Sequence, residues 1–105
     1  LDVNGLYEDR DRLAEGEVVV IPLAELEDLR VRLLVTRRGE WPSHRDEGEE
    51  RYIILRGAVE YTTEHTFTVR EGQMITFQPG EEHAARIQEG AVSIHIDRHR
   101  GVSPR

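Results

Sequence analysis

The sequence of 105 residues contains no cysteine and no lysine, and all 14 of its basic residues are arginine. Without cysteine the chain has no disulfide bond, thiolate nucleophile, zinc knuckle or iron–sulfur cluster. Without lysine it has no Schiff base and no P-loop lysine for phosphate binding. Any catalysis or metal binding must therefore come from histidine, carboxylate, tyrosine and hydroxyl side chains.

Positive charge and long apolar runs are also scarce. The 21 acidic residues outnumber the basic ones and give a formal net charge of −7. Nucleic acids and anionic membranes are held chiefly by clustered positive charge, so we expect neither as a partner. The best apolar run, residues 18–21, is too short to span a bilayer, and the polar start of the chain does not suit a signal peptide. We therefore expect a cytoplasmic protein.

Short apolar runs recur at intervals of roughly ten residues, separated by glycine or proline, as in all-β sandwiches and barrels. We expect one all-β domain over residues 1–105 with a single core. We expect residues 1–15 to form an N-terminal extension that contains a short helix or no regular structure. Residues 101–105 are expected to form a loose tail. The predicted strands cover residues 17–21, 31–36, 51–55, 58–63, 66–69, 74–77, 83–87 and 91–97.

Two segments between these strands have their own pattern. Leu23, Leu26 and Leu29 recur every three residues among acidic residues, which predicts one or two helical turns over residues 22–30. Around residues 64–65 the flanking segments are rich in β-branched and aromatic residues, so this pair is predicted to be the tip of a hairpin.

The residues best suited to metal chemistry lie in two short stretches. In a strand, His44 and Asp46 would share a face, and Glu50 would share a face with Tyr52 if it opens the next strand. His83 follows a Pro-Gly turn at the start of a later strand. Two imidazoles with one or two carboxylates suit a divalent transition metal such as iron, manganese, nickel or zinc.

Each stretch also has a simpler interpretation when it is taken alone. Residues 45–51 are polar throughout and would suit a solvated loop. His83 alone would be read as a surface histidine near a turn, and His65 and His99 are expected at the surface. The occurrence of both stretches in order favours metal binding over these readings.

The first stretch resembles a motif of the cupins, small proteins that fold as a double-stranded β-helix or jelly roll. That motif is a glycine, a spacer, His-x-His, three or four residues, a glutamate, six residues and a glycine. The matching residues here are Gly39, His44, Glu50 and Gly57. Asp46 stands where the second histidine is expected.

The second stretch resembles the second cupin motif, which is a glycine, a strand, a proline and glycine, two residues and a histidine. The matching residues are Gly72, Pro79, Gly80 and His83, with the proline displaced by one position. Ile87 stands where an asparagine often follows. Because both motifs occur in order, the resemblance implies a jelly-roll barrel with a metal site.

By this resemblance His44, Glu50 and His83 would be metal ligands inside the barrel, with Asp46 at the position of the fourth. The Asp46 side chain is shorter than histidine, so it could bind directly, act through a bridging water or pair with Arg45. Two carboxylate ligands would favour iron, manganese or nickel over copper, whereas a closed tetrahedron would suggest structural zinc. The pattern is also similar to the facial triad of oxoglutarate-dependent oxygenases, whose chains are usually much longer.

Five further residues are candidates for binding or catalysis. His95 could be an acid/base group on a pocket-lining face, or a surface histidine. Tyr52 could hydrogen-bond a ligand near the metal, or be a core aromatic. Trp41 could wall the pocket mouth or pack in a core or dimer interface. Arg32 and Arg86 could bind a substrate carboxylate or lie in ordinary ion pairs.

The sequence leaves three functions open. The first is an enzyme whose metal acts on a small organic molecule as a Lewis acid or dioxygen activator, in isomerase, lyase or dioxygenase-like chemistry. The second is a non-catalytic module that binds or senses a small ligand, with a structural metal or none. The third is a barrel that serves mainly to form a homodimer through an exposed first strand at residues 17–21.

Overall fold

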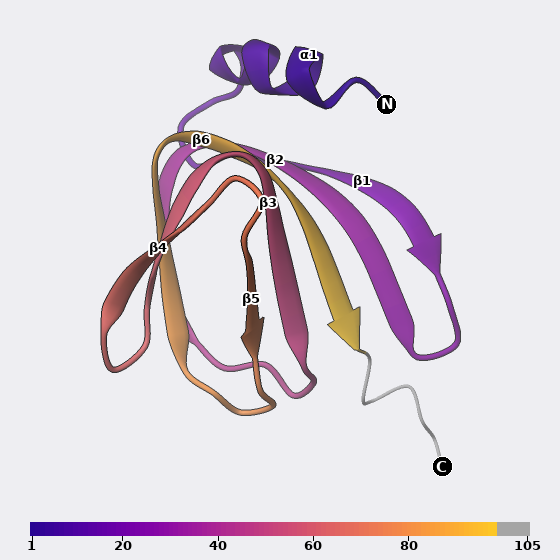
Figure 1. Cartoon of the computed structure of the whole chain (residues 1–105), viewed down its shortest axis with the longest axis vertical. Helices are drawn as coiled ribbons and strands as arrows, with labels where there is room; N and C mark the ends of the chain where they lie inside the picture. Colours follow the sequence, from indigo (N-terminus) through magenta and orange to yellow (C-terminus); the bar gives the residue numbers. More distant parts are fainter. Residues whose placement is uncertain (99–105) are drawn as a thin grey trace.

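The computed structural model describes residues 1–98, and these form the predicted all-β fold (Figure 1). All strand pairs are antiparallel, in the order β1-β2-β6-β3-β4, with β5 paired to β3. The predicted tail at residues 101–105 and the surface position of His99 lie outside the described residues. The elements are α1 (Val3–Glu8), a 3-10 helix (Asp9–Arg12), β1 (Val18–Glu25), β2 (Leu29–His44), β3 (Glu50–Thr62), β4 (Thr66–Arg70), β5 (Met74–Phe77) and β6 (His83–Arg98).

Two strands, β3 and β6, are longer than predicted because they bend and continue where the sequence suggested a break. The two pairs of strands predicted around Gly57 and Gly90 are the halves of β3 and β6. Gly57 has a φ of 83° and Gly90 a φ of 143°, and a Cβ atom on Gly57 would lie 2.2 Å from the Gly90 carbonyl oxygen. Glycine therefore lets the two strands bend against each other and continue, rather than ending them.

The helical turns predicted over residues 22–30 are wrong. Strand β1 runs to Glu25, the chain turns, and β2 begins at Leu29, with Glu25 paired to Arg30 across the hairpin. Proline is accepted at Pro22 because β1 is an edge strand and the register shifts just after this residue. The leucine spacing of three arises from two strands and a turn, and Leu26 is 60% exposed rather than packed.

The buried residues form two clusters rather than the single core expected. Alternate residues of a strand face opposite sides, and the central strands are apolar on both. The inner cluster lies within the bent sheet and includes Ile54, Tyr61 and Phe77. The outer cluster is built on Leu33, Val35 and Val92 and is covered by partly buried residues of the N-terminal extension, including Val3, Leu6, Tyr7 and Leu13. The extension, with α1 as its helix, therefore completes the domain.

The first strand is the exposed edge of the sheet. Among residues 1–98, strand β1 pairs with β2 alone, and its Val20 and Leu23 are 44% and 42% exposed. The homodimer expected through residues 17–21 stays a prediction. No helix within residues 1–98 has the length and apolar character needed to cross a membrane.

Candidate metal centre

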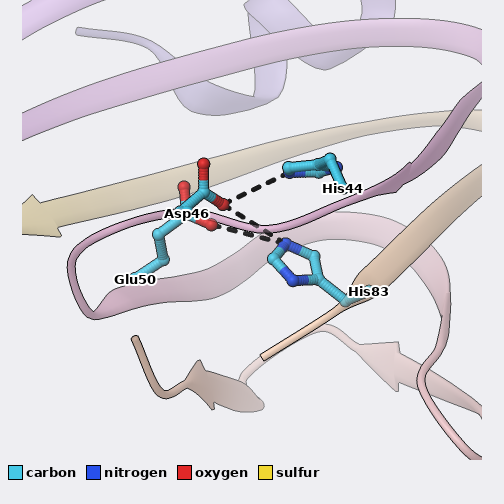
Figure 2. A group of neighbouring side chains, drawn as sticks. All are labelled: His44, Asp46, Glu50 and His83. Atoms are coloured by element: carbon cyan, nitrogen blue, oxygen red, sulfur yellow. Dashed lines mark ion pairs between the residues drawn. The ribbon is translucent and has the colours of Figure 1, made fainter. Parts of the chain in front are cut away.

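The four residues predicted as metal ligands lie close together (Figure 2). His44 ends β2, Asp46 lies in the loop that follows, Glu50 opens β3 and His83 opens β6. One potential ligand atom from each lies within 4.8 Å of the others. The chain therefore gathers the group that the two motifs indicated, although metal binding itself stays a prediction.

Strand register and a loop contact bring these side chains together. His44 and His83 are cross-strand partners in the β2–β6 pair. Asp46 lies just beyond β2 rather than within it, but its carbonyl oxygen accepts a hydrogen bond of 2.8 Å from the Gly80 amide. The Pro-Gly turn before His83 thus also fixes the loop that carries Asp46.

The two histidines direct their Nε2 atoms toward the cluster. Nδ1 of His44 lies 3.1 Å from the Pro42 carbonyl oxygen, and Nδ1 of His83 lies 3.0 Å from that of Glu81. A carbonyl oxygen can only accept, so each Nδ1 donates a hydrogen bond and each Nε2 is the ring nitrogen left to face the cluster. The ring of Phe77 stacks on His83 with centroids 3.9 Å apart, which fixes the imidazole plane.

The facing atoms of the cluster are all electron-pair donors. His83 Nε2 lies 3.4 Å from Glu50 Oε1 and 3.7 Å from Asp46 Oδ2, and His44 Nε2 lies 3.3 Å from Asp46 Oδ2 (Figure 2). Three of these atoms, Asp46 Oδ2, Glu50 Oε1 and His83 Nε2, are buried without a hydrogen-bond partner. Orphaned buried polar atoms are costly, and a cation among them would satisfy all three. The donor set therefore fits a divalent metal ion.

The two carboxylates differ in their affinity for a proton. A hydrogen bond that only protonated Asp46 can donate to Glu50, together with burial and the Glu50 charge, raises the pKa of Asp46 to about 6. Burial would raise the pKa of Glu50, but hydrogen bonds from His95 and Asp46 outweigh it and lower this pKa to about 2. Without a metal, the pair therefore shares one proton, held chiefly by Asp46, until the pH exceeds about 6.

Behind Glu50 lies a buried chain of hydrogen bonds. His95, which is 3% exposed, has Nε2 at 2.8 Å from Glu50 Oε2 and Nδ1 at 2.8 Å from Nη2 of Arg32. A guanidinium can only donate, so Nδ1 accepts and Nε2–H donates to the carboxylate. Both ring nitrogens of His95, a predicted catalytic residue, are thus engaged away from the cavity. Sequence reasoning missed this contact because Arg32 and His95 meet only through the β2–β6 register.

A cavity of about 240 Å³ adjoins the imidazoles of His44 and His83. Trp41 lines it and packs on the inner cluster, and Tyr52 lines it while stacking on His95. Tyr61 also lines the cavity, although a strict two-residue period would place it on the face opposite Tyr52. Register shifts in β3 between these two residues bring both side chains to the cavity, and the sequence carries no signal of those shifts. Burial raises the pKa of the Tyr52 and Tyr61 hydroxyls, so both stay protonated at neutral pH.

Neither arginine considered as a carboxylate binder lines this cavity. Arg32 donates to His95. Arg86 lines separate surface hollows together with Gln88 and Glu89.

Comparison with known proteins gives a consistent result. A family model described as "Cupin domain" matches residues 31–96. Among solved structures, a cupin-2 domain protein from Shewanella frigidimarina is 21% identical with a TM-score of 0.70, and the match covers 89% of this chain and 92% of that one. A conserved protein of unknown function from Streptococcus pyogenes is 24% identical, with a TM-score of 0.70 and coverage of 82% and 77%. KdgF from a Halomonas species is 18% identical, with a TM-score of 0.72 and coverage of 84% and 85%. No curated protein matches the chain. At these identities the structural likeness concerns the fold alone.

Proposed function

The chain belongs to the cupin family and has its all-β jelly-roll fold, and we propose that it binds a divalent transition-metal ion and presents it to a small organic molecule. The proposed ligands are His44, Asp46, Glu50 and His83. One observation carries the proposal: their facing atoms are all electron-pair donors, and three of them are buried without a partner. A divalent ion would satisfy these atoms and balance the two carboxylate charges.

The residues around the cluster suit it to hold such an ion. Imidazole and carboxylate ligands together suit iron, manganese, nickel or zinc. His95 occupies Glu50 Oε2 and so directs Oε1 toward the centre, while Phe77 and the Glu81 carbonyl orient His83. When bound, the ion supplies Lewis acidity or dioxygen activation to a molecule in the adjoining cavity.

The cavity supports an enzymatic role of isomerase, lyase or dioxygenase type. It reaches His44 and His83, so a molecule within it would meet the ion on their side. Its walls are mostly apolar and would exclude water from the bound molecule. The side chain of His44 is 45% exposed, which leaves the centre accessible from the rim.

A second function, a non-catalytic module that binds a small molecule, is favoured by a different observation. Apart from His44 and His83, the ionisable groups that line the cavity within the described part of the chain are Tyr52 and Tyr61. Their raised pKa values keep both hydroxyls protonated at neutral pH, so neither tyrosine can accept a proton from a substrate. Both nitrogens of His95 are hydrogen-bonded, one to Arg32 and one to Glu50. An enzyme at this site would therefore depend on the ion for nearly all of its chemistry.

Metal analysis of protein purified without chelators tests the proposal. We expect about one transition-metal ion per chain of the wild-type protein. The His83→Ala variant should carry none, because the change removes a buried ligand. The matched control is His65→Ala, at an exposed hairpin position, which should keep the ion. If the wild-type protein neither carries a metal nor binds one on addition, the proposal is wrong. An oxygen-uptake screen of the loaded protein then separates oxygenase chemistry from the other classes.

A further inference from the structure

The cavity beside the centre is small. Its volume of about 240 Å³ lies below the range of about 300–1,000 Å³ that is usual for small-molecule sites. Trp41, Tyr52 and Tyr61 contribute large, flat side chains to its wall. A molecule about the size of one ring would fill it.

The wall offers hydrogen bonds but no positive charge. Within residues 1–98, its polar side chains other than the two imidazoles are uncharged: the hydroxyls of Thr36, Tyr52, Tyr61 and Ser93 and the indole N–H of Trp41. Every basic residue of the chain apart from histidine is arginine, and no arginine lines the cavity in the described part of the chain. An anionic group placed against this wall would have no counter-charge and would lose its hydration.

The metal centre itself adds no surplus positive charge. With a divalent ion, the carboxylates of Asp46 and Glu50 bring the formal charge of the group to zero. The Arg32 guanidinium lies behind His95 and is bound to it. A ligand that needs a second anionic anchor, such as a phosphate or a further carboxylate, therefore finds none.

We propose that the cavity takes a compact, largely apolar molecule of about one ring that meets the metal through a single oxygen-donor group and carries no second anionic group. This inference rests on the proposed function, because the metal is the anchor for that group. The cavity would give the metal site selectivity, because the part of the molecule remote from the metal is recognised by apolar contact and uncharged polar groups.

Two hydroxamic acids that share one metal-binding head test the selectivity. The para-methyl and para-carboxy derivatives of benzohydroxamic acid have similar size and differ in the charge of the remote group. Calorimetric titration of Zn²⁺-loaded protein should show that the para-methyl compound binds at least about tenfold more tightly than the para-carboxy compound. The reason is that the carboxylate of the latter would be buried without a partner. Equal binding, or a preference for the carboxylate, would overturn the inference.

A matched pair of variants tests whether the missing positive charge is the cause. Val18 lines the cavity, whereas Val20 lies on the same strand, is 44% exposed and does not line it. Val18→Arg should strengthen binding of the para-carboxy compound about tenfold, and Val20→Arg should leave it unchanged. An equal effect of both variants, or no effect of Val18→Arg in a folded, Zn²⁺-loaded protein, would contradict the proposed cause.

Failure of this inference differs from failure of the proposed function. Zn²⁺ binding is measured first, in the absence of any hydroxamic acid. If Zn²⁺ does not bind, the proposed function itself is wrong. If Zn²⁺ binds but the carboxylate compound is preferred, the metal centre stands and the selectivity assigned to the cavity is wrong.

Discussion

The imidazole of His95 joins Glu50 to Arg32, so its replacement by alanine should affect both the stability of the fold and the affinity for metal. The change removes two hydrogen bonds of 2.8 Å, one to Glu50 Oε2 and one from Arg32. Hydrogen bonds to charged groups contribute about 1.5–3 kcal/mol each, and both partners would be left buried or half-buried without the ring. The free energy of unfolding of the metal-free protein should therefore fall by about 3 kcal/mol.

Metal affinity should fall together with stability. The carboxylate of Glu50 is held with Oε1 toward the cluster because Oε2 is bound by His95. Loss of such an outer contact typically weakens metal binding by about 10–100-fold, or about 1.4–2.8 kcal/mol. His95→Gln should recover part of the affinity, since an amide can donate to Glu50 and accept from Arg32.

The assay is Zn²⁺ binding by competition calorimetry together with urea unfolding of the metal-free forms. His65→Ala, an exposed histidine on the tip between β3 and β4, is the control for histidine loss. The unfolding data show whether the alanine variant is folded, and His95→Gln supplies the comparison if it is not. Wild-type affinity in a folded His95→Ala protein would refute the positioning role inferred for His95.

Three further predictions follow from other contacts. Asp46→Ala should weaken Zn²⁺ binding as much as His83→Ala if Asp46 binds the ion directly, but only about tenfold if it acts through water, as calorimetry will show. The Gly57 amide and a neighbouring arginine lower the pKa of exposed Glu71, so its contribution to stability is present above the ordinary value of 4.5 and is lost as pH falls through the lowered pKa. Urea unfolding should show Glu71→Gln less stable than wild type at neutral pH and equal to it in acid, and a difference independent of pH would contradict this. Gly57→Ala should lower the free energy of unfolding by about 2 kcal/mol or more beyond the effect of Gly72→Ala. Both glycines have a φ of 83°, but only at Gly57 would the added Cβ collide with neighbouring backbone. Equal unfolding free energies of the two variants would show that the close approach to Gly90 is not limiting.

The metal candidates could be predicted because the relevant signals are local. His44, Asp46 and Glu50 lie within seven residues of one another, and a Pro-Gly turn marks His83. Residue spacing and the turn marked the candidates, and the resemblance to the two cupin motifs selected the four side chains that the structure brings within 4.8 Å.

The rest of the site depends on strand register, which the sequence does not display. Arg32 and His95 are 63 residues apart and meet because β2 and β6 pair with one particular alignment. Asp46 converges with the histidines from a loop rather than from the predicted strand face, through a bond to the Gly80 amide. Only the folded chain shows that His95 hydrogen-bonds Glu50 and Arg32 and does not line the cavity.

The errors in the fold have the same origin. Gly57 and Gly90 were interpreted as breaks between strands, yet they allow two long strands to bend past each other. The leucines at residues 23–29 mimic a helical period because a hairpin places them on an edge strand, in its turn and on the next strand. Tertiary pairing overrides the local pattern in both cases.

We propose that His44, Asp46, Glu50 and His83 bind one metal ion together. The most direct test is the anomalous difference density of Zn²⁺-loaded crystals, measured at the zinc absorption edge. We expect one strong peak about 2.0–2.2 Å from His44 Nε2, His83 Nε2 and Glu50 Oε1, with an Asp46 oxygen at the same distance or one water further away. A strong peak elsewhere, or none at this cluster in Zn²⁺-saturated protein, would contradict it.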